Sequence, residues 1–199
     1  MKVSEVLAHA RVRLRDDNAE FTKIGDDYLM SLVYFWQNQL LAEFGRNIKE
    51  FKFTLNEQDE LEIPFEMNRI IAVYLGTSRL DLTSYAAFLE KKDEGNLCVF
   101  EKAPQVLGFS HIINGSGELY AVKKAVINSK DDELILGDEF INLLVLNIVL
   151  DTMKAQISPD NSQRIALFEQ VLQKERDRVC AFLARKQSPL NFQSPFIRA

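Results

Sequence analysis

The sequence is poor in the residues that build metal sites and disulfide frameworks. Its 199 residues include two cysteines and two histidines. Cys98 and Cys180 lie in apolar stretches far apart in the chain, so two buried free thiols are favoured over one disulfide. His9 and His111 have no cysteine or acid at metal-ligand spacing, and a structural or surface role is favoured for each. We therefore expect no metal-binding residues and no cofactor.

A long hydrophobic run is also missing. The longest apolar stretch, 140–150, is interrupted by Asn142 and Asn147, whereas a membrane-spanning helix takes about 20 residues. The first residues lead directly into a charged amphipathic helix and do not resemble a signal peptide. We therefore expect a protein that folds in a cytoplasm without a membrane partner, with both cysteines reduced.

The composition carries no excess of positive charge. The net charge is −5 and the isoelectric point is about 5.2, which makes the chain as a whole a poor binder of nucleic acid. Apolar residues make up 47% and charged residues 27%, which is typical of a globular chain and excludes a disordered or collagenous one. A chain of this length corresponds to one domain, or to one domain with an appendage.

The hydrophobic periodicity predicts four long helices, at 4–15, 26–46, 138–156 and 160–186. The last two form a helical hairpin. The 138–156 helix is apolar nearly all round, so we expect it to be covered on nearly all sides. Trp36 lies on the apolar stripe of the second helix, and we expect it to be largely buried against the C-terminal hairpin.

Between these helices the period changes to two, which predicts a β-rich part at 49–127. Residues 49–63 alternate around a polar stretch at 56–59, and we interpret them as a hairpin with a turn there. The sequence Asn-Gly-Ser-Gly at 114–117 is the strongest hairpin signal in the chain. A short helix is expected at 83–92, capped by its first residue.

This order of elements predicts an α+β fold. We expect an N-terminal helix pair, a small and mainly antiparallel β-sheet insertion, and a C-terminal helical hairpin with an extended tail. Residues 1–187 would form a single domain. Residues 188–199, here called the C-terminal arm, contain two Ser-Pro steps that disfavour helix.

The chain shows no legible catalytic constellation. Three Asp-Asp pairs occur at loops or helix starts, where capping and solubility explain them: Asp16-Asp17, Asp26-Asp27 and Asp131-Asp132. The Gly-x-Gly at 115–117 leads into a strand and not into a helix, so a phosphate loop is disfavoured. We expect no catalytic and no cofactor-binding residues.

The charges and the tail are more informative. Residues 57–101 hold ten acids and four bases, whereas residues 174–199 hold six bases and two acids. These opposite balances fit either solvated faces or complementarity between copies. Apolar side chains in a tail usually dock on a surface. The candidate interface residues are Leu190, Phe192, Phe196, Ile197, Arg178, Arg185 and Lys186.

Several segments resemble the head-to-tail connector, or neck adaptor, proteins of tailed bacteriophages and prophages. The opening helix pair is similar at 28–32 and 35–41. An apolar-x-apolar-Pro segment at 61–64 precedes a β-branched strand at 69–74. The family's last strand, loop and start of the helical hairpin are similar to Ala121–Val126 and Leu134–Phe140.

The resemblance implies a structural protein and not an enzyme. It implies a ring of about a dozen copies that binds the portal protein and tail proteins. DNA would pass through the channel without sequence-specific binding. The chain would occur in the host bacterial cytoplasm during assembly and in the virion neck afterwards. The residues themselves leave two alternative functions open. One is a small oligomeric binding or regulatory module of phage or bacterial origin, and the other is an enzyme whose active site cannot be recognised in the sequence.

Overall fold

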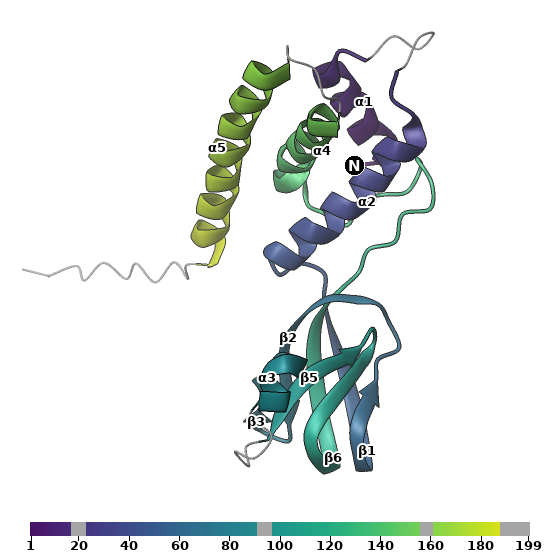
Figure 1. The fold of residues 1–199 in the computed structure, drawn as a ribbon, viewed down its shortest axis with the longest axis vertical. Coiled ribbons are helices and arrows are strands. Elements are labelled where there is room, and N and C mark those ends of the chain that lie inside the picture. Colours follow the sequence, from purple (N-terminus) through teal and green to yellow (C-terminus); the bar gives the residue numbers. More distant parts are fainter. Residues whose placement is uncertain (17–22, 91–96, 156–160, 188–199) are drawn as a thin grey trace, which may run out of the picture. The chain divides into compact units, whose positions relative to one another are not determined.

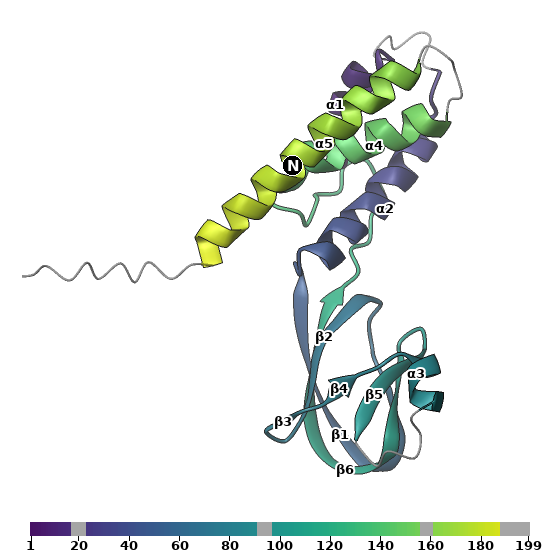
Figure 2. The same cartoon turned by 60° about the vertical axis from the view of Figure 1, so that its left-hand side comes forward.

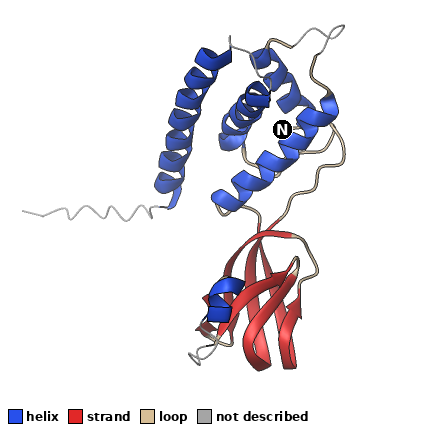
Figure 3. Cartoon of the chain, in the orientation of Figure 1, coloured by secondary structure: helices blue, strands red, loops and turns tan. Residues whose placement is uncertain are grey.

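The computed structural model describes residues 1–16, 23–90, 97–155 and 161–187. It contains both helices and strands, so the chain belongs to the α+β class (Figure 3). The chain divides into two compact units. Met1–Val33 and Lys130–Ala199 form the first, called here the helical unit, and Tyr34–Ser129 form the second, called the sheet unit.

The four long helices are confirmed, with bounds that differ from the predicted ones by at most three residues. They are α1 (Val3–Leu14), α2 (Asp26–Glu43), α4 (Ile141–Ala155) and α5 (Asn161–Gln187), and a short 3-10 turn, η1 (Asp138–Phe140), precedes α4 (Figure 1). The first part of α2 belongs to the helical unit and its second part to the sheet unit.

Helix α4 forms the core of the helical unit. Every residue from Leu143 to Leu150 is buried, and the helix packs against α1 and α5. Its buried polar side chains bond to their own helix, because Asn147 donates to the Leu143 carbonyl at 2.8 Å and Thr152 to the Ile148 carbonyl at 2.8 Å. The prediction that this helix is covered on nearly all sides is confirmed.

A half-buried arginine joins the end of α1 to the start of α2. Arg11 donates to the Asp16 carboxylate at 2.7 Å and to the Ile24 carbonyl at 2.9 Å, and it also pairs with Asp26. Lys130 bonds to the other oxygen of Asp26. The hydrogen bonds from Lys130 and then from Arg11 hold the pKa of Asp26 below its usual value. The acid pairs noted in the sequence are therefore structural in part.

The sheet unit is built on one central strand. Its elements are β1 (Ile48–Glu62), β2 (Met67–Leu75), β3 (Ser78–Arg79), β4 (Asp81–Leu82), α3 (Tyr85–Glu90), β5 (Cys98–Ala103) and β6 (Val106–Lys123) (Figures 1 and 2). Strand β6 pairs with β1, β2 and β5 in antiparallel register, and among the described strands only the two-residue β4–β5 pair is parallel. The result is a mixed, nearly closed sheet.

The hairpin predicted around 56–59 is wrong. Strand β1 runs through this stretch and stays paired with β6, with register shifts between Asn56 and Gln58 and between Gln58 and Glu60. Glu57 takes a positive φ of 51°, which marks a β-bulge. The polar residues therefore bend one strand and do not connect two.

The turn predicted at 114–117 is also wrong, because these residues lie inside β6. Gly115 faces Leu55 and Gly117 faces Phe53 across the β1–β6 pair. A Cβ atom on Gly117 would lie 2.3 Å from the Tyr74 carbonyl oxygen and 2.5 Å from the Phe53 ring. The glycine therefore permits a close approach of backbone and ring.

The tight connections occur elsewhere. Gly76, with a φ of 59°, lies between β2 and β3, and Gln105, with a φ of 64°, lies between β5 and β6. The short helix is confirmed in part: α3 begins at Tyr85, and the hydroxyl of Ser84 accepts a hydrogen bond from the Ala87 amide at 3.1 Å. Ser84, and not the predicted Thr83, caps the helix.

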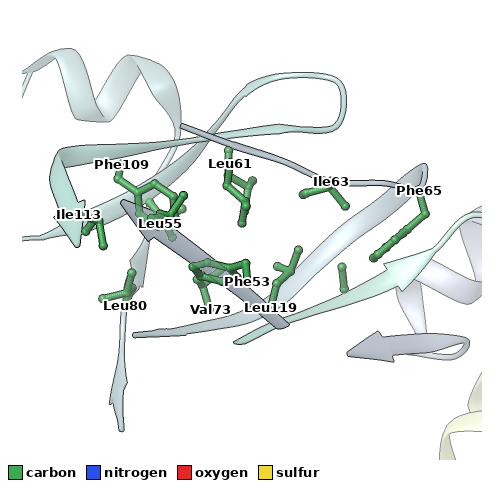
Figure 4. Packing of buried hydrophobic residues seen from close by; sticks show 13 residues of the cluster. Phe53, Leu55, Leu61, Ile63, Phe65, Val73, Leu80, Phe109, Ile113 and Leu119 are labelled. Carbon is green, nitrogen blue, oxygen red and sulfur yellow. The ribbon is translucent and has the colours of Figure 1, made fainter. Parts of the chain in front are cut away.

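The core of the sheet unit lies inside the curved sheet. Alternate residues of β1 point inward, and they meet residues of β2, β5 and β6 (Figure 4). The rings of Phe53 and Phe109 lie 6.3 Å apart. The cluster comprises Phe53, Leu55, Leu61, Ile63, Phe65, Val73, Leu80, Val99, Leu107, Phe109, Ile113, Leu119 and Ala121.

A buried asparagine ties the end of α2 to the chain that leaves β6. Asn38 donates to the Ala125 carbonyl at 3.0 Å and accepts from the Ala125 amide at 2.8 Å. Its side chain thereby makes the two backbone hydrogen bonds that a neighbouring strand would otherwise make. Asn68 donates to the same amide oxygen of Asn38 at 2.9 Å. These bonds satisfy a buried backbone segment that lies beyond the strand pairs.

Two expectations about single side chains need correction. Trp36 is half-buried, and its ring lies edge-on to Phe35 at 5.3 Å between centroids. Both cysteines are free, but Cys98 is half-buried and Cys180 is exposed. The apolar neighbours of Cys180 in the sequence occupy other faces of its helix, and for this reason the prediction of burial is wrong.

We predict that Gly117→Val destabilises the sheet unit by about 1–3 kcal/mol, because the added side chain meets the Tyr74 carbonyl and the Phe53 ring. Urea unfolding followed by circular dichroism measures the change. Ser116→Ala, at an exposed neighbour on the same strand, is the matched control and should change little. Equal stability of the two variants would contradict the close approach at Gly117.

Candidate interaction surfaces

The two histidines of the sequence belong to different units of the chain, and both are exposed. His9 is exposed on α1, and His111 is exposed on β6 with its Nδ1 atom 2.9 Å from the Ser110 hydroxyl. Within the described ranges, no group of three or more histidine, cysteine or acidic side chains is arranged to hold a metal ion.

Arg178, one of the candidate interface residues, already bonds within its own helical unit. It donates to both carboxylate oxygens of Glu175, at 2.6 and 2.9 Å, and to the Glu139 carbonyl at 3.2 Å. The guanidinium thereby connects α5 to η1, the turn that precedes α4. About half of the Arg178 side chain is nevertheless exposed and remains able to face a partner.

The same carboxylate extends the connection to α1. The hydrogen bonds from Arg178 lower the pKa of Glu175, and Asn142 and Arg13 add to this effect. Arg13 donates to the Asn142 side chain at 2.6 Å, and its burial lowers the pKa of the guanidinium. Polar bonds therefore link α1, α4 and α5 beside their apolar contact.

The other predicted interface residues lie at the end of the chain. Arg185 and Lys186 are exposed in the last turn of α5, and the Lys186 ammonium lies 4.5 Å from the centroid of the Phe182 ring. Leu190, Phe192, Phe196 and Ile197 lie outside the described residues.

Helix α5 presents an uncovered apolar pair. Leu167 is 59% exposed and Val171 is 41% exposed, one turn apart. Lys174 and Arg178 continue the same helical face at the next turns. This set of four side chains is called the α5 face. It combines two exposed apolar residues with two cations.

A second exposed apolar surface lies on the sheet unit. Leu82, Tyr85 and Leu89 are between 41% and 53% exposed, and we call them the α3 patch. Behind it the rings of Phe88 and Phe100 stack at 4.3 Å, and Tyr85 lies 5.4 Å from Phe100. This aromatic stack holds the patch in place on β5.

Acidic side chains border the α3 patch. Glu60 pairs with Lys102, and this hydrogen bond raises the pKa of Lys102. The end of β1 lies close to the patch, because Glu60 of β1 and Phe100 of β5 pair with the same residue of β6, Gly108, and the Tyr85 ring packs on Phe100. Asp59 and Tyr85 both lie within electrostatic reach of the Lys102 ammonium. Asp81 is exposed directly before Leu82. Among the described residues named here, three are acids and one, Lys102, is a base.

A shallow groove lies on another face of the sheet unit. It has a volume of about 340 Å³, and residues of β1, β2 and β6 line it. The rings of Tyr74 and Tyr120 meet edge-on at 6.0 Å, and the Tyr120 hydroxyl donates to Glu118 at 2.9 Å. That hydrogen bond raises the pKa of Tyr120.

The sequence analysis missed the α3 patch and the α5 face. Tyr85 and Leu89 lie four residues apart within the predicted short helix, and Leu167 and Val171 have the same spacing within the last helix. This spacing indicates a shared face, but it is equally typical of a buried face.

No protein-family model matches the chain, and no curated protein matches it. In the part of the chain that the structure describes, no helix has both the length and the apolar character needed to cross a membrane.

We predict that Glu175→Gln flattens the acid dependence of stability. Because its pKa is lowered in the folded protein, ionised Glu175 stabilises the fold fully above the ordinary glutamate pKa of about 4.3, and this contribution is lost as the pH falls through the lowered value. Thermal unfolding between pH 7 and pH 3 measures the effect.

The matched control is Glu169→Gln, which removes an exposed partner of Lys154 on the same helix. The wild type should lose more stability on acidification than Glu175→Gln, and the control should follow the wild type. Parallel profiles for the wild type and Glu175→Gln would contradict the assigned role.

Proposed function

We propose that this chain is a structural subunit of an oligomeric assembly, of the kind found in phage head-to-tail connectors. In this proposal the copies form a ring between portal and tail, and the chain carries out no catalysis. The resemblance of the sequence segments motivates the specific class, and the exposed surfaces of the fold support assembly as the activity.

The observation that carries the proposal is the incomplete burial of α5. The helix spans 27 residues, and among its described side chains only Val179 and Leu183 are buried. Leu167 and Val171 are exposed on a rigid element. Exposed apolar groups that are clustered on rigid elements are typical of contact surfaces.

The arrangement of the chain agrees with the resemblance. Both ends of the chain contribute to the helical unit, and the middle supplies the sheet unit. In the proposal, α1 and α2 correspond to the opening helix pair, and α4 and α5 correspond to the helical hairpin of the connector family. The terminal segment of that family corresponds to the C-terminal arm of this chain.

The proposed contacts of the assembly include the end of α5 and the arm. Arg185 and Lys186 supply exposed positive charge, and the arm supplies four large apolar side chains. An arm of this composition gains free energy by docking, at about 1.5–3 kcal/mol for each buried side chain before the cost of ordering.

A second candidate is a binding module without catalysis. The groove beside Tyr74 and Tyr120 favours it, since two aromatic rings, aliphatic side chains and one carboxylate converge there. Its shallow form suits a peptide or a protein surface more than an enclosed small molecule.

The direct test of the proposal is co-sedimentation with the portal ring encoded in the same genome. We expect the full chain to join the portal as a ring of uniform copy number, seen by sedimentation velocity and by electron microscopy. A chain that stays at the monomer mass of 22.9 kDa, both alone and with the portal, would contradict the proposed function.

Removing the arm should separate assembly from folding. We predict that deletion of 188–199 leaves the thermal unfolding of the chain unchanged but lowers its binding to the portal or to neighbouring copies. A full-length variant with serine at the four apolar arm positions is the control for chain length and should behave like the deletion. Loss of stability with unchanged binding by the folded fraction would show that the arm belongs to the core.

A further inference from the structure

We propose that the α3 patch of one copy binds the α5 face of a second copy. The inference rests on the proposed function, because it names the surfaces through which copies of an assembly subunit would meet. It is argued from the exposure and the charge of these two surfaces.

Both surfaces expose apolar side chains at matched spacing. The α3 patch presents Tyr85 and Leu89 one helical turn apart, and the α5 face presents Leu167 and Val171 one helical turn apart. Helices that expose residues at this spacing can interdigitate side chains along their length. Leu82 adds to the apolar pair of the α3 patch, and exposed Lys174 follows the apolar pair of the α5 face.

The flanking charges have opposite sign. Asp59, Glu60 and Asp81 border the α3 patch, and Lys102 balances part of their charge. Lys174 and Arg178 continue the α5 face, and part of the Arg178 charge is balanced by Glu175. Asp59 and Lys174 are both exposed, so a contact between them adds attraction across the interface.

The match is between two different surfaces, so the contact is heterologous. Each copy carries both surfaces and can bind one neighbour through each of them. A heterologous contact generates a closed ring if the rotation closes, and a pair of copies joined by one such contact still has one surface of each kind free for the next copy. Two identical α3 patches would bring acidic borders together, and like charges oppose that pairing.

Charge reversal in the full chain tests the contact. Asp59→Lys and Lys174→Glu should each weaken self-association by about tenfold or more, because each places like charges across the contact. Leu89→Ser and Leu167→Ser should weaken it similarly through lost apolar burial. The association constant is measured by sedimentation velocity over a concentration series, or on the portal ring if copies associate only there.

Mixing the two charge variants separates a contact between copies from one within a chain. In an equimolar mixture, position 59 of the Asp59→Lys variant is positive and meets the negative position 174 of the Lys174→Glu variant. The native Asp59–Lys174 pair forms in the reverse direction. The mixture should therefore recover most of the wild-type association. A contact within one chain cannot recover in this way, since each chain keeps its own mismatch.

Val126→Ser and Val12→Ser are the matched controls, because they remove exposed apolar side chains from the sheet unit and the helical unit outside the two surfaces. Both should associate like the wild type.

Two results would overturn the inference while leaving the proposed function in place: assembly that none of the four variants weakens, or charge variants that stay defective when mixed. A wild-type chain that associates neither alone nor on the portal would contradict both the inference and the proposed function.

Discussion

The sheet unit depends on the pairing of β6 along both of its edges. Strand β1 bonds to one edge over nearly its whole length, and β2 and β5 share the other edge. Strand β2 and the first half of β1 pair with β6 at or beyond residues 114–117, so both lose this pairing if β6 cannot run through. The absence of a side chain at Gly117 makes this passage possible, because the Tyr74 carbonyl and the Phe53 ring occupy the space that a Cβ atom would need.

The helical unit has a different organisation, with one helix enclosed and one only partly covered. Helix α4 is buried along Leu143–Leu150 and needs both α1 and α5 as cover. Among the described side chains of α5, Val179 and Leu183 are buried, so the helix covers α4 through a narrow apolar contact around them. The polar bonds of Glu175 stabilise this contact. Leu167 and Val171 lie outside this contact and are exposed.

The two units offer surfaces of different chemistry. The sheet unit combines apolar groups with acids around α3, and α5 combines apolar groups with cations. Identical surfaces would favour isolated dimers, whereas unlike surfaces allow each copy to have two neighbours. The net charge of −5 is therefore less informative than its distribution over the two units.

The sequence alone determined the helices and the α+β class, because the helical period of apolar residues is a local property. The nearly all-apolar sequence of α4 likewise predicts that this helix is buried. Tertiary structure decided the connections of the sheet. The polar stretches at 56–59 and 114–117 suit turns locally, but Asn56 pairs with Asn114 across β1 and β6, and a long strand pair outweighs two local turn preferences. It also decided which apolar side chains stay exposed. The spacing of Leu167 and Val171 is the same on a covered and an uncovered face, so only the packing partner of the helix distinguishes them.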